Sequence, residues 1–255
     1  MFFKKNSFNP TIIFILTLFV GYFFAQIHTF EQRAVDAALV LSNLVNYPDQ
    51  ISPMKEYFFK SWTSLHQISK LLLSINLSFL SISKLIIFLT AILYFTGIVL
   101  TINSATKSIF LSILTALIIL IFQKNLGDVD YPTLFFSEHT YGMVSLAMVT
   151  CIFGLLLSGS LFLAGLFSSL MISIHPIVGL WISAVIISSL IINKYYFKIT
   201  LNQKRFIKGF IIGTIFTSIS FVSYYILIAD FNSYFDLESY NNYMKHWEGH
   251  RNETG

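Results

Sequence analysis

Residues 85–103 read LIIFLTAILYFTGIVLTIN, nineteen residues without a single charge. About 20 consecutive apolar residues are needed for an α-helix to cross the hydrocarbon core of a bilayer. Similar apolar runs lie on both sides of this stretch, at 10–27, 108–123, 141–158, 160–175, 177–193 and 209–229. The sequence therefore predicts an all-α fold: a polytopic transmembrane helical bundle of about seven spans, formed by one transmembrane domain over residues 1–255.

The composition agrees with a surface that faces lipid. Of the 255 residues, 55% are hydrophobic and only 11% are charged, whereas about a quarter of the residues of a soluble domain are charged. The basic pI of 9.0 would suggest nucleic acid as a partner of a soluble protein. Here the positions of the charges explain it better, so we expect membrane lipid as a partner and no nucleic acid. The single cysteine, Cys151, excludes an internal disulfide framework and offers no zinc pattern.

The lysines and arginines predict an orientation, because cytoplasmic loops are enriched in them. With the N-terminus in the cytoplasm and 11–27 as a first span, the cytoplasmic pieces are 1–9, 104–107, 158–160 and 194–208. They hold no acid and eight basic residues: Lys4, Lys5, Lys107, Lys194, Lys198, Lys204, Arg205 and Lys208. The remaining basic residues, all twelve acids and all six histidines lie on the other side. We expect a multi-pass protein of the bacterial inner (plasma) membrane whose polar groups face the periplasm or exterior.

The longest outer segment, 28–84, is predicted to be a helical loop. One helix is expected from Glu31 to Val45. A second, from Met54 to about Leu73, should follow a Ser52-Pro53 start, where serine caps the helix and proline occupies its first position. This second helix carries aromatic and lysine side chains, which suits a helix lying along the membrane interface.

Asp128 and Asp130 form a D-x-D pair in the second outer segment. Two carboxylates this close repel each other unless a hard divalent cation shares them. The pair is thus a candidate site for Mg²⁺ or Mn²⁺. The alternative is a solvated acidic turn after Gly127.

Glu138, His139 and His175 are candidate catalytic residues. The spans 141–158 and 160–175 are joined by a very short turn and should pack antiparallel, which brings these three side chains to the same depth. A carboxylate beside an imidazole is a plausible general acid–base pair. The alternative is that Glu138 only caps a helix and that His175 makes one structural hydrogen bond.

Two further groups follow the first and last spans. Glu31 and Asp36 lie just past the first span and are candidates for a base facing a cavity under the outer loop, or for interfacial charges near Arg33. Near the C-terminus, Trp247, His250 and Arg251 are candidates for substrate binding, since arginine recognises phosphate and carboxylate bidentately. The end of the sequence shows no obvious stop, and we expect the chain to be the N-terminal part of a longer protein.

This layout resembles the GT-C superfamily of polytopic glycosyltransferases, which use polyprenyl-phosphate-linked sugars. Several short motifs also look like those of a set of uncharacterised bacterial multi-span proteins: Pro53-Met54, Trp62, His66-Gln67, Ser137-Glu138-His139, His175-Pro176, and Trp247 with His250-Arg251-Asn252. The resemblance implies a membrane enzyme of envelope glycan or lipid-linked sugar assembly, with a lipid-phosphate-linked sugar as donor. The first outer loop lacks the usual acidic pair. A transporter or flippase and a non-catalytic membrane scaffold remain the alternatives.

Overall fold

In the computed structural model, every regular element of the described residues is an α-helix. The structure describes residues 10–28, 32–45, 53–123, 136, 140–196, 203–229, 236–239 and 241–242. Its helices are α1 (Pro10–Ile27), α2 (Arg33–Leu41), α3 (Pro53–Lys60), α4 (Ser64–Ser74), α5 (Phe79–Thr106), α6 (Ile109–Ile121), α7 (Thr140–Leu157), α8 (Leu161–Ile174), α9 (Pro176–Tyr195) and α10 (Gln203–Ile228). The predicted all-α class is confirmed.

Four of these helices are long and apolar enough to cross a membrane: α5, α7, α9 and α10. Three shorter apolar helices accompany them: Ile13–Ile27 within α1, α6 and α8. Much of the surface of α9 and α10 is apolar and exposed, as with Trp181 and Ile226. Such a surface would be unstable in water but suits a helix surrounded by lipid. The chain therefore has the helices of a membrane protein.

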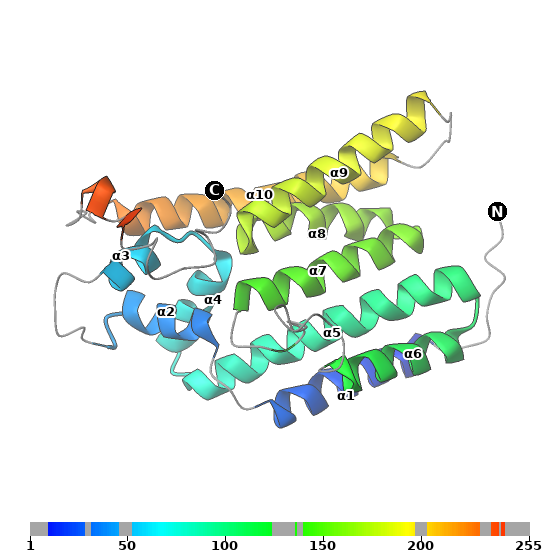
Figure 1. The fold of residues 1–255 in the computed structure, drawn as a ribbon, viewed down its shortest axis with the longest axis horizontal. Helices are drawn as coiled ribbons and strands as arrows, with labels where there is room; N and C mark the ends of the chain where they lie inside the picture. Colours follow the sequence, from blue (N-terminus) through cyan, green and yellow to red (C-terminus); the bar gives the residue numbers. More distant parts are fainter. Residues whose placement is uncertain are drawn as a thin grey trace.

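The apolar helices lie side by side and alternate in direction along the chain (Figure 1). Within this bundle α5 packs against α1, α6 and α7, while α8 packs against α7, α9 and α10. The pair α7–α8 joins the two groups. The predicted break at His175-Pro176 and the predicted tight turn at 158–160 are both present, because α8 ends at Ile174 and α7 ends at Leu157.

Glycines lie where the packed helices cross most closely. A Cβ atom on Gly97 would overlap the backbone of α7, and one on Gly154 would overlap the backbone of α5. A Cβ on Gly209 would overlap the carbonyl of Phe162, and one on Gly213 would overlap Ser169. Small residues let helices approach closely inside a membrane, where lipid is as apolar as leucine and packing supplies much of the attraction. The Gly209-x-x-x-Gly213 spacing carries this signal in the sequence, and the sequence analysis did not use it.

The three short helices α2–α4 gather at one end of the bundle, referred to below as the α2–α4 end (Figure 1). The expected helix from Met54 to Leu73 is wrong as one continuous element. It is divided into α3 and α4 at residues 61–63, where Thr63 accepts a hydrogen bond from the backbone N–H of Leu65 and caps α4. The predicted helix start at Pro53 is confirmed. The first predicted helix is shorter than expected, since α2 spans Arg33–Leu41 only.

Two apolar helices begin earlier than predicted. α5 begins at Phe79, where the Ser78 side chain accepts a hydrogen bond from the Ser81 N–H. Lys84, placed in the outer loop by the sequence analysis, therefore lies inside α5 and donates to Gln26 Oε1 at 3.1 Å. α10 begins at Gln203 and so includes three basic residues that were assigned to the preceding loop: Lys204, Arg205 and Lys208. Polar residues close to a span continue the helix because its backbone hydrogen bonds extend beyond the apolar core.

Candidate functional site

A buried polar cluster ties the start of α2 to the bundle. The Gln32 N–H donates to Ser83 Oγ of α5 at 3.1 Å. The Thr140 hydroxyl of α7 donates to Gln32 Oε1 at 2.9 Å and accepts from the Ala34 N–H at 3.1 Å. Gln32 and Thr140 are both 0% exposed. Buried polar groups are costly unless they are hydrogen-bonded, so these bonds fix the position of α2 against α5 and α7.

A second polar pair, of which His66 is buried and Tyr141 partly buried, joins α4 to α7. His66 Nε2 contacts the Tyr141 hydroxyl, and the two rings meet edge to face with centroids 5.3 Å apart. His66 is 2% exposed. Burial lowers the pKa of His66 from 6.5 to about 4, and a backbone hydrogen bond with Ser61 opposes that shift. The imidazole is consequently neutral at pH 7 and can exchange a hydrogen bond with the phenol in either direction. Arg33 lies close enough to Tyr141 for its charge to act on the phenol.

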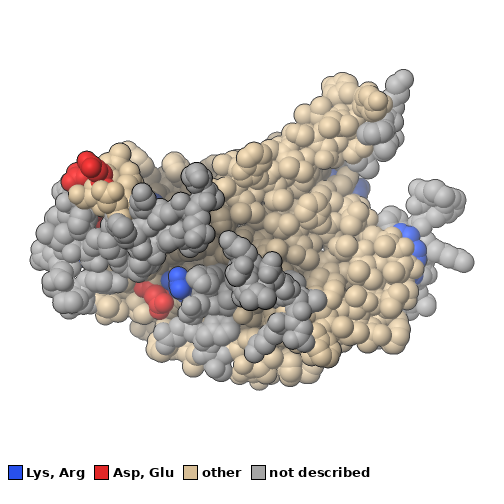
Figure 2. Space-filling view, viewed as in Figure 1, with Lys and Arg blue, Asp and Glu red and all other residues tan. Residues whose placement is uncertain are grey.

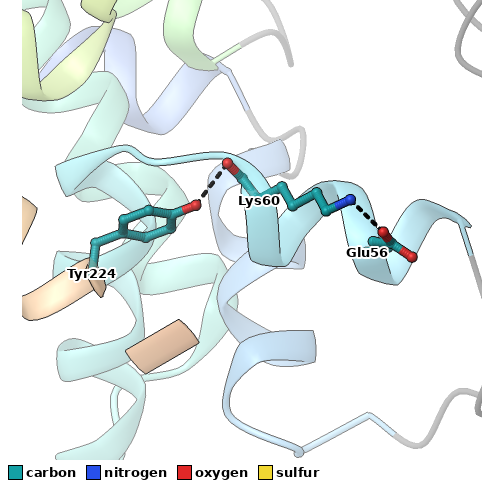
Figure 3. A network of polar contacts seen from close by, with 3 residues as sticks. All are labelled: Glu56, Lys60 and Tyr224. Carbon is teal, nitrogen blue, oxygen red and sulfur yellow. Dashed lines mark hydrogen bonds and ion pairs between the residues drawn. The ribbon is translucent and has the colours of Figure 1, made fainter. Parts of the chain in front are cut away.

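A charged pair on α3 continues the polar layer towards α10 (Figure 3). The Glu56 carboxylate is buried and forms an ion pair with Lys60 one helical turn later. The backbone carbonyl of Lys60 accepts a hydrogen bond from the Tyr224 hydroxyl at 2.7 Å. Figure 3 shows Tyr224 reaching α3 from α10, so the C-terminal part of α10 contacts the same layer.

The segment between α3 and α4 is fixed to α8 and α10. Trp62 Nε1 donates to Ser220 Oγ at 3.2 Å, and Gln67 Nε2 donates to the Ser220 carbonyl at 2.8 Å. The Ser220 hydroxyl donates in turn to Gln67 Oε1 at 2.6 Å. The Thr63 hydroxyl donates to the Ile174 carbonyl at 3.0 Å, at the C-terminal end of α8. Trp62, His66 and Gln67 of the quoted motifs thus make direct contacts between helices.

Two of the predicted site residues lie in the described part of the chain. His175 forms the joint between α8 and α9: its N–H donates to the Met171 carbonyl, its carbonyl accepts from the Gly179 N–H, and its side chain is half-buried. It directly follows Ile174, which accepts the hydrogen bond from Thr63. Asp36 lies in the first turn of α2 with its side chain exposed. Both are therefore at the α2–α4 end of the bundle.

The other predicted site residues lie outside the described residues: Glu31, Asp128, Asp130, Glu138, His139, Trp247, His250 and Arg251. The antiparallel contact between α7 and α8, on which the grouping of Glu138, His139 and His175 depends, is present. Among the residues that the structure describes, no group of three His, Cys, Asp or Glu side chains could hold a metal ion. The metal role of Asp128 and Asp130 stays a prediction.

The Gln32–Thr140 and His66–Tyr141 pairs were not among the predicted site residues. The predicted site residues are mainly charged residues and histidines between spans, whereas Gln32, Thr140 and Tyr141 are uncharged. A usable signal was the position of Thr140 and Tyr141 at the start of an apolar run. Polar side chains at the end of a span need partners because the surroundings are poor in water.

The described acids lie at one end of the molecule, whereas described basic residues lie at both ends. The described acids are Asp36 on α2, Glu56 on α3, and Asp236 and Glu238 beyond α10. On the face drawn in Figure 2, red acidic side chains appear at the α2–α4 end, and the charges coloured at the opposite end are blue. Lys107 follows α5 at that opposite end, and Lys194 lies in the last turn of α9. The charge asymmetry expected from the sequence is thus visible in the described part of the structure.

No family model, no curated protein and no solved structure matches the chain.

Proposed function

We propose that the chain is a seven-span membrane protein that assembles envelope glycan or lipid-linked sugar on the non-cytoplasmic side, as a polyprenyl-phosphate-sugar-dependent glycosyltransferase. One observation carries this proposal. The short helices α2, α3 and α4 pack at one end of the bundle, where His66 and Glu56 are buried and Tyr141 is partly buried, and these side chains form a polar layer. A membrane enzyme that transfers a sugar from a lipid carrier needs polar groups at that depth, since the phosphate of its donor lies at the membrane surface.

In this proposal, the polar layer and the segments outside the spans would both contribute residues to the reaction. A glycosyl acceptor needs a base to remove its proton, and the carboxylates Glu31, Asp36 and Glu138 are the candidates. His139 and His175 would act beside them in proton transfer. The leaving group is a phosphate, which Arg251 could bind through two parallel hydrogen bonds, with His250 and Trp247 beside it. A divalent cation, Mg²⁺ or Mn²⁺, held by Asp128 and Asp130 would neutralise the phosphate charge.

The distribution of charges supports the proposed placement in the membrane. With Lys107, Lys194 and Lys204 on the cytoplasmic side, the α2–α4 end faces the periplasm or exterior of the bacterial inner membrane. Seven crossings then require α1, α6 and α8 to span as well, and α6 with 13 residues and α8 with 14 residues are short for this task. A short helix is accommodated by local thinning of the bilayer at modest cost.

The test is sugar transfer by the purified full chain in lipid nanodiscs that contain a radiolabelled polyprenyl-phosphate sugar. We expect transfer to an acceptor to fall at least about a hundredfold in Glu138→Gln and in His175→Ala, a size typical for loss of an acid–base group. Glu238→Gln is the matched control, because Glu238 is an exposed acid at the same end outside the candidate site. Folding is checked for each variant by its melting temperature.

A transporter or flippase is the second candidate. Such a protein would move the lipid carrier across the membrane and would not consume it. The wild-type chain and the same variants, reconstituted in vesicles, distinguish a flippase from a glycosyltransferase. A flippase moves the labelled lipid between the leaflets and transfers no sugar. If sugar transfer and lipid movement are both absent in the wild-type chain, the enzymatic proposal is wrong and a scaffold is the better description.

A further inference from the structure

The end of the bundle opposite α2–α4 presents a group of basic side chains on α9 and α10. Lys194 lies in the last turn of α9, and Lys204 and Lys208 lie in the first two turns of α10; all three are exposed. The Lys194 ammonium lies 5.0 Å from the centre of the Tyr195 ring. None of the described acids lies on α9 or α10, so the described part of this surface is positive.

An apolar groove opens between the two helices directly beside these lysines. Both α9 and α10 pack on α8, and α9 leans away from α10 towards its C-terminal end (Figure 1). The groove has a volume of about 280 Å³. Its walls are mainly aliphatic and aromatic side chains, with Lys194 at one edge: Ile187, Leu190, Ile191, Phe206, Ile207 and Phe210.

The groove is a fixed feature of the bundle. Gln203 Nε2 at the start of α10 donates to the Leu190 carbonyl of α9 at 2.8 Å and so holds the two helices in register. Phe206 is only 2% exposed and stacks with Phe210 at a centroid distance of 6.0 Å, which makes a rigid aromatic wall.

A second hollow of about 330 Å³ lies along the same turns of α10 and is lined by Lys204, Ile207, Lys208, Ile211 and Ile212. Ile207 lines both hollows. All lining residues of the second hollow lie on α10, so it is a shallow extension of the same apolar surface. Each hollow has at least one lysine among its lining residues, which suits a molecule with a hydrocarbon chain and a negative group.

We propose that the α9–α10 groove binds an anionic phospholipid, with an acyl chain between Ile191 and Phe210 and the phosphate near Lys194, Lys204 and Lys208. Basic pockets between membrane helices favour lipids with negative headgroups, because each lysine near the surface attracts the lipid phosphate. In a zwitterionic lipid, the positive group of the headgroup offsets this attraction. The groove has a volume of about 280 Å³ and mainly aliphatic walls, which suits part of an acyl chain. The proposal depends only on the chain lying in a membrane and is independent of sugar transfer.

The test is native mass spectrometry of the full chain in detergent, titrated with dioleoyl phosphatidylglycerol or with dioleoyl phosphatidylcholine. We expect phosphatidylglycerol to bind at least about tenfold more tightly. The variant Lys194→Gln/Lys204→Gln/Lys208→Gln should remove that preference, since three surface lysines together account for more than a tenfold change in affinity. Equal affinities for the two lipids in the wild-type chain would overturn the proposal.

A second variant tests whether the acyl chain binds in the groove, and it changes no charge. Ile191→Trp fills the groove and should weaken phosphatidylglycerol binding about tenfold. Ile226→Trp is the matched control: Ile226 is an exposed isoleucine of α10 outside both hollows, and its replacement should leave binding unchanged. Equal effects of the two tryptophans would show that the groove does not hold the acyl chain and would overturn the proposal.

Discussion

At the scale of single residues, His66 makes the docking of α4 sensitive to acid. In the folded chain burial lowers the pKa of His66 to about 4, against 6.5 when the side chain meets water. Between these two values the undocked state binds more protons than the folded state, so stability is fully present above pH 6.5 and decreases as the pH falls towards 4. From these two pKa values, wild-type stability should fall by about 2 kcal/mol between pH 7.5 and pH 5 through this residue alone.

The measurement is the melting temperature of the purified chain at pH 7.5 and pH 5, for the wild type and for His66→Gln. Glutamine keeps a polar group that can contact the Tyr141 hydroxyl but does not titrate. The acids of the chain titrate in both proteins, so the difference between the two pH dependences isolates the imidazole. An identical loss of melting temperature in both proteins would show that His66 is not buried in its neutral form.

At the scale of elements, the contact between α8 and α10 depends on glycine. A side chain at Gly209 would overlap the carbonyl of Phe162, which is backbone and cannot turn aside. Gly209→Leu should therefore separate the two helices and destabilise the chain by about 2 kcal/mol or more, the usual cost of overpacking a tight contact. Thermal unfolding in detergent measures this change. Ser218→Leu adds similar bulk to the same helix on an exposed face and should melt within a degree or two of the wild type; an equal loss in both variants would contradict the role of the close approach.

The same elements show how far sequence reasoning reaches. The apolar run at 10–27 predicted both ends of α1, because hydropathy alone defines a helix whose ends leave the hydrocarbon core. Hydropathy could not predict the start of α5 or of α10, where polar residues such as Lys84 and Lys204 continue the helix into the interface. It also joined α3 and α4, because the break at Thr63 depends on the bond of its hydroxyl to Ile174, more than a hundred residues away. The site pairs were missed for the same reason: His66 and Tyr141 are brought together only by the packing of α4 on the bundle.

At the scale of the whole molecule, the alternation of helices leaves two membrane topologies to be distinguished. If all seven apolar helices cross, the chain passes the bilayer twice between Lys107 and Ser158, through α6 and α7, and both residues lie on the same side of the membrane. If only α5, α7, α9 and α10 cross, a single passage separates them and Ser158 lies on the side opposite Lys107. Both topologies place Asp236 opposite Lys107, since five or three passages separate the two positions.

Single cysteines at these three positions decide between the topologies. Cys151 is buried, so it should react little with a thiol reagent and can be replaced by serine as a precaution. In intact cells, a membrane-impermeant maleimide should label Asp236→Cys and leave Lys107→Cys and Ser158→Cys unlabelled until the membrane is opened. Labelling of Ser158→Cys together with Asp236→Cys would mean that α6 and α8 do not cross, and labelling of Lys107→Cys alone would reverse the orientation of the four-helix topology. We expect seven crossings, because α6 and α8 expose apolar side chains such as Phe110 and Leu163, and apolar surface is more stable in hydrocarbon than in water.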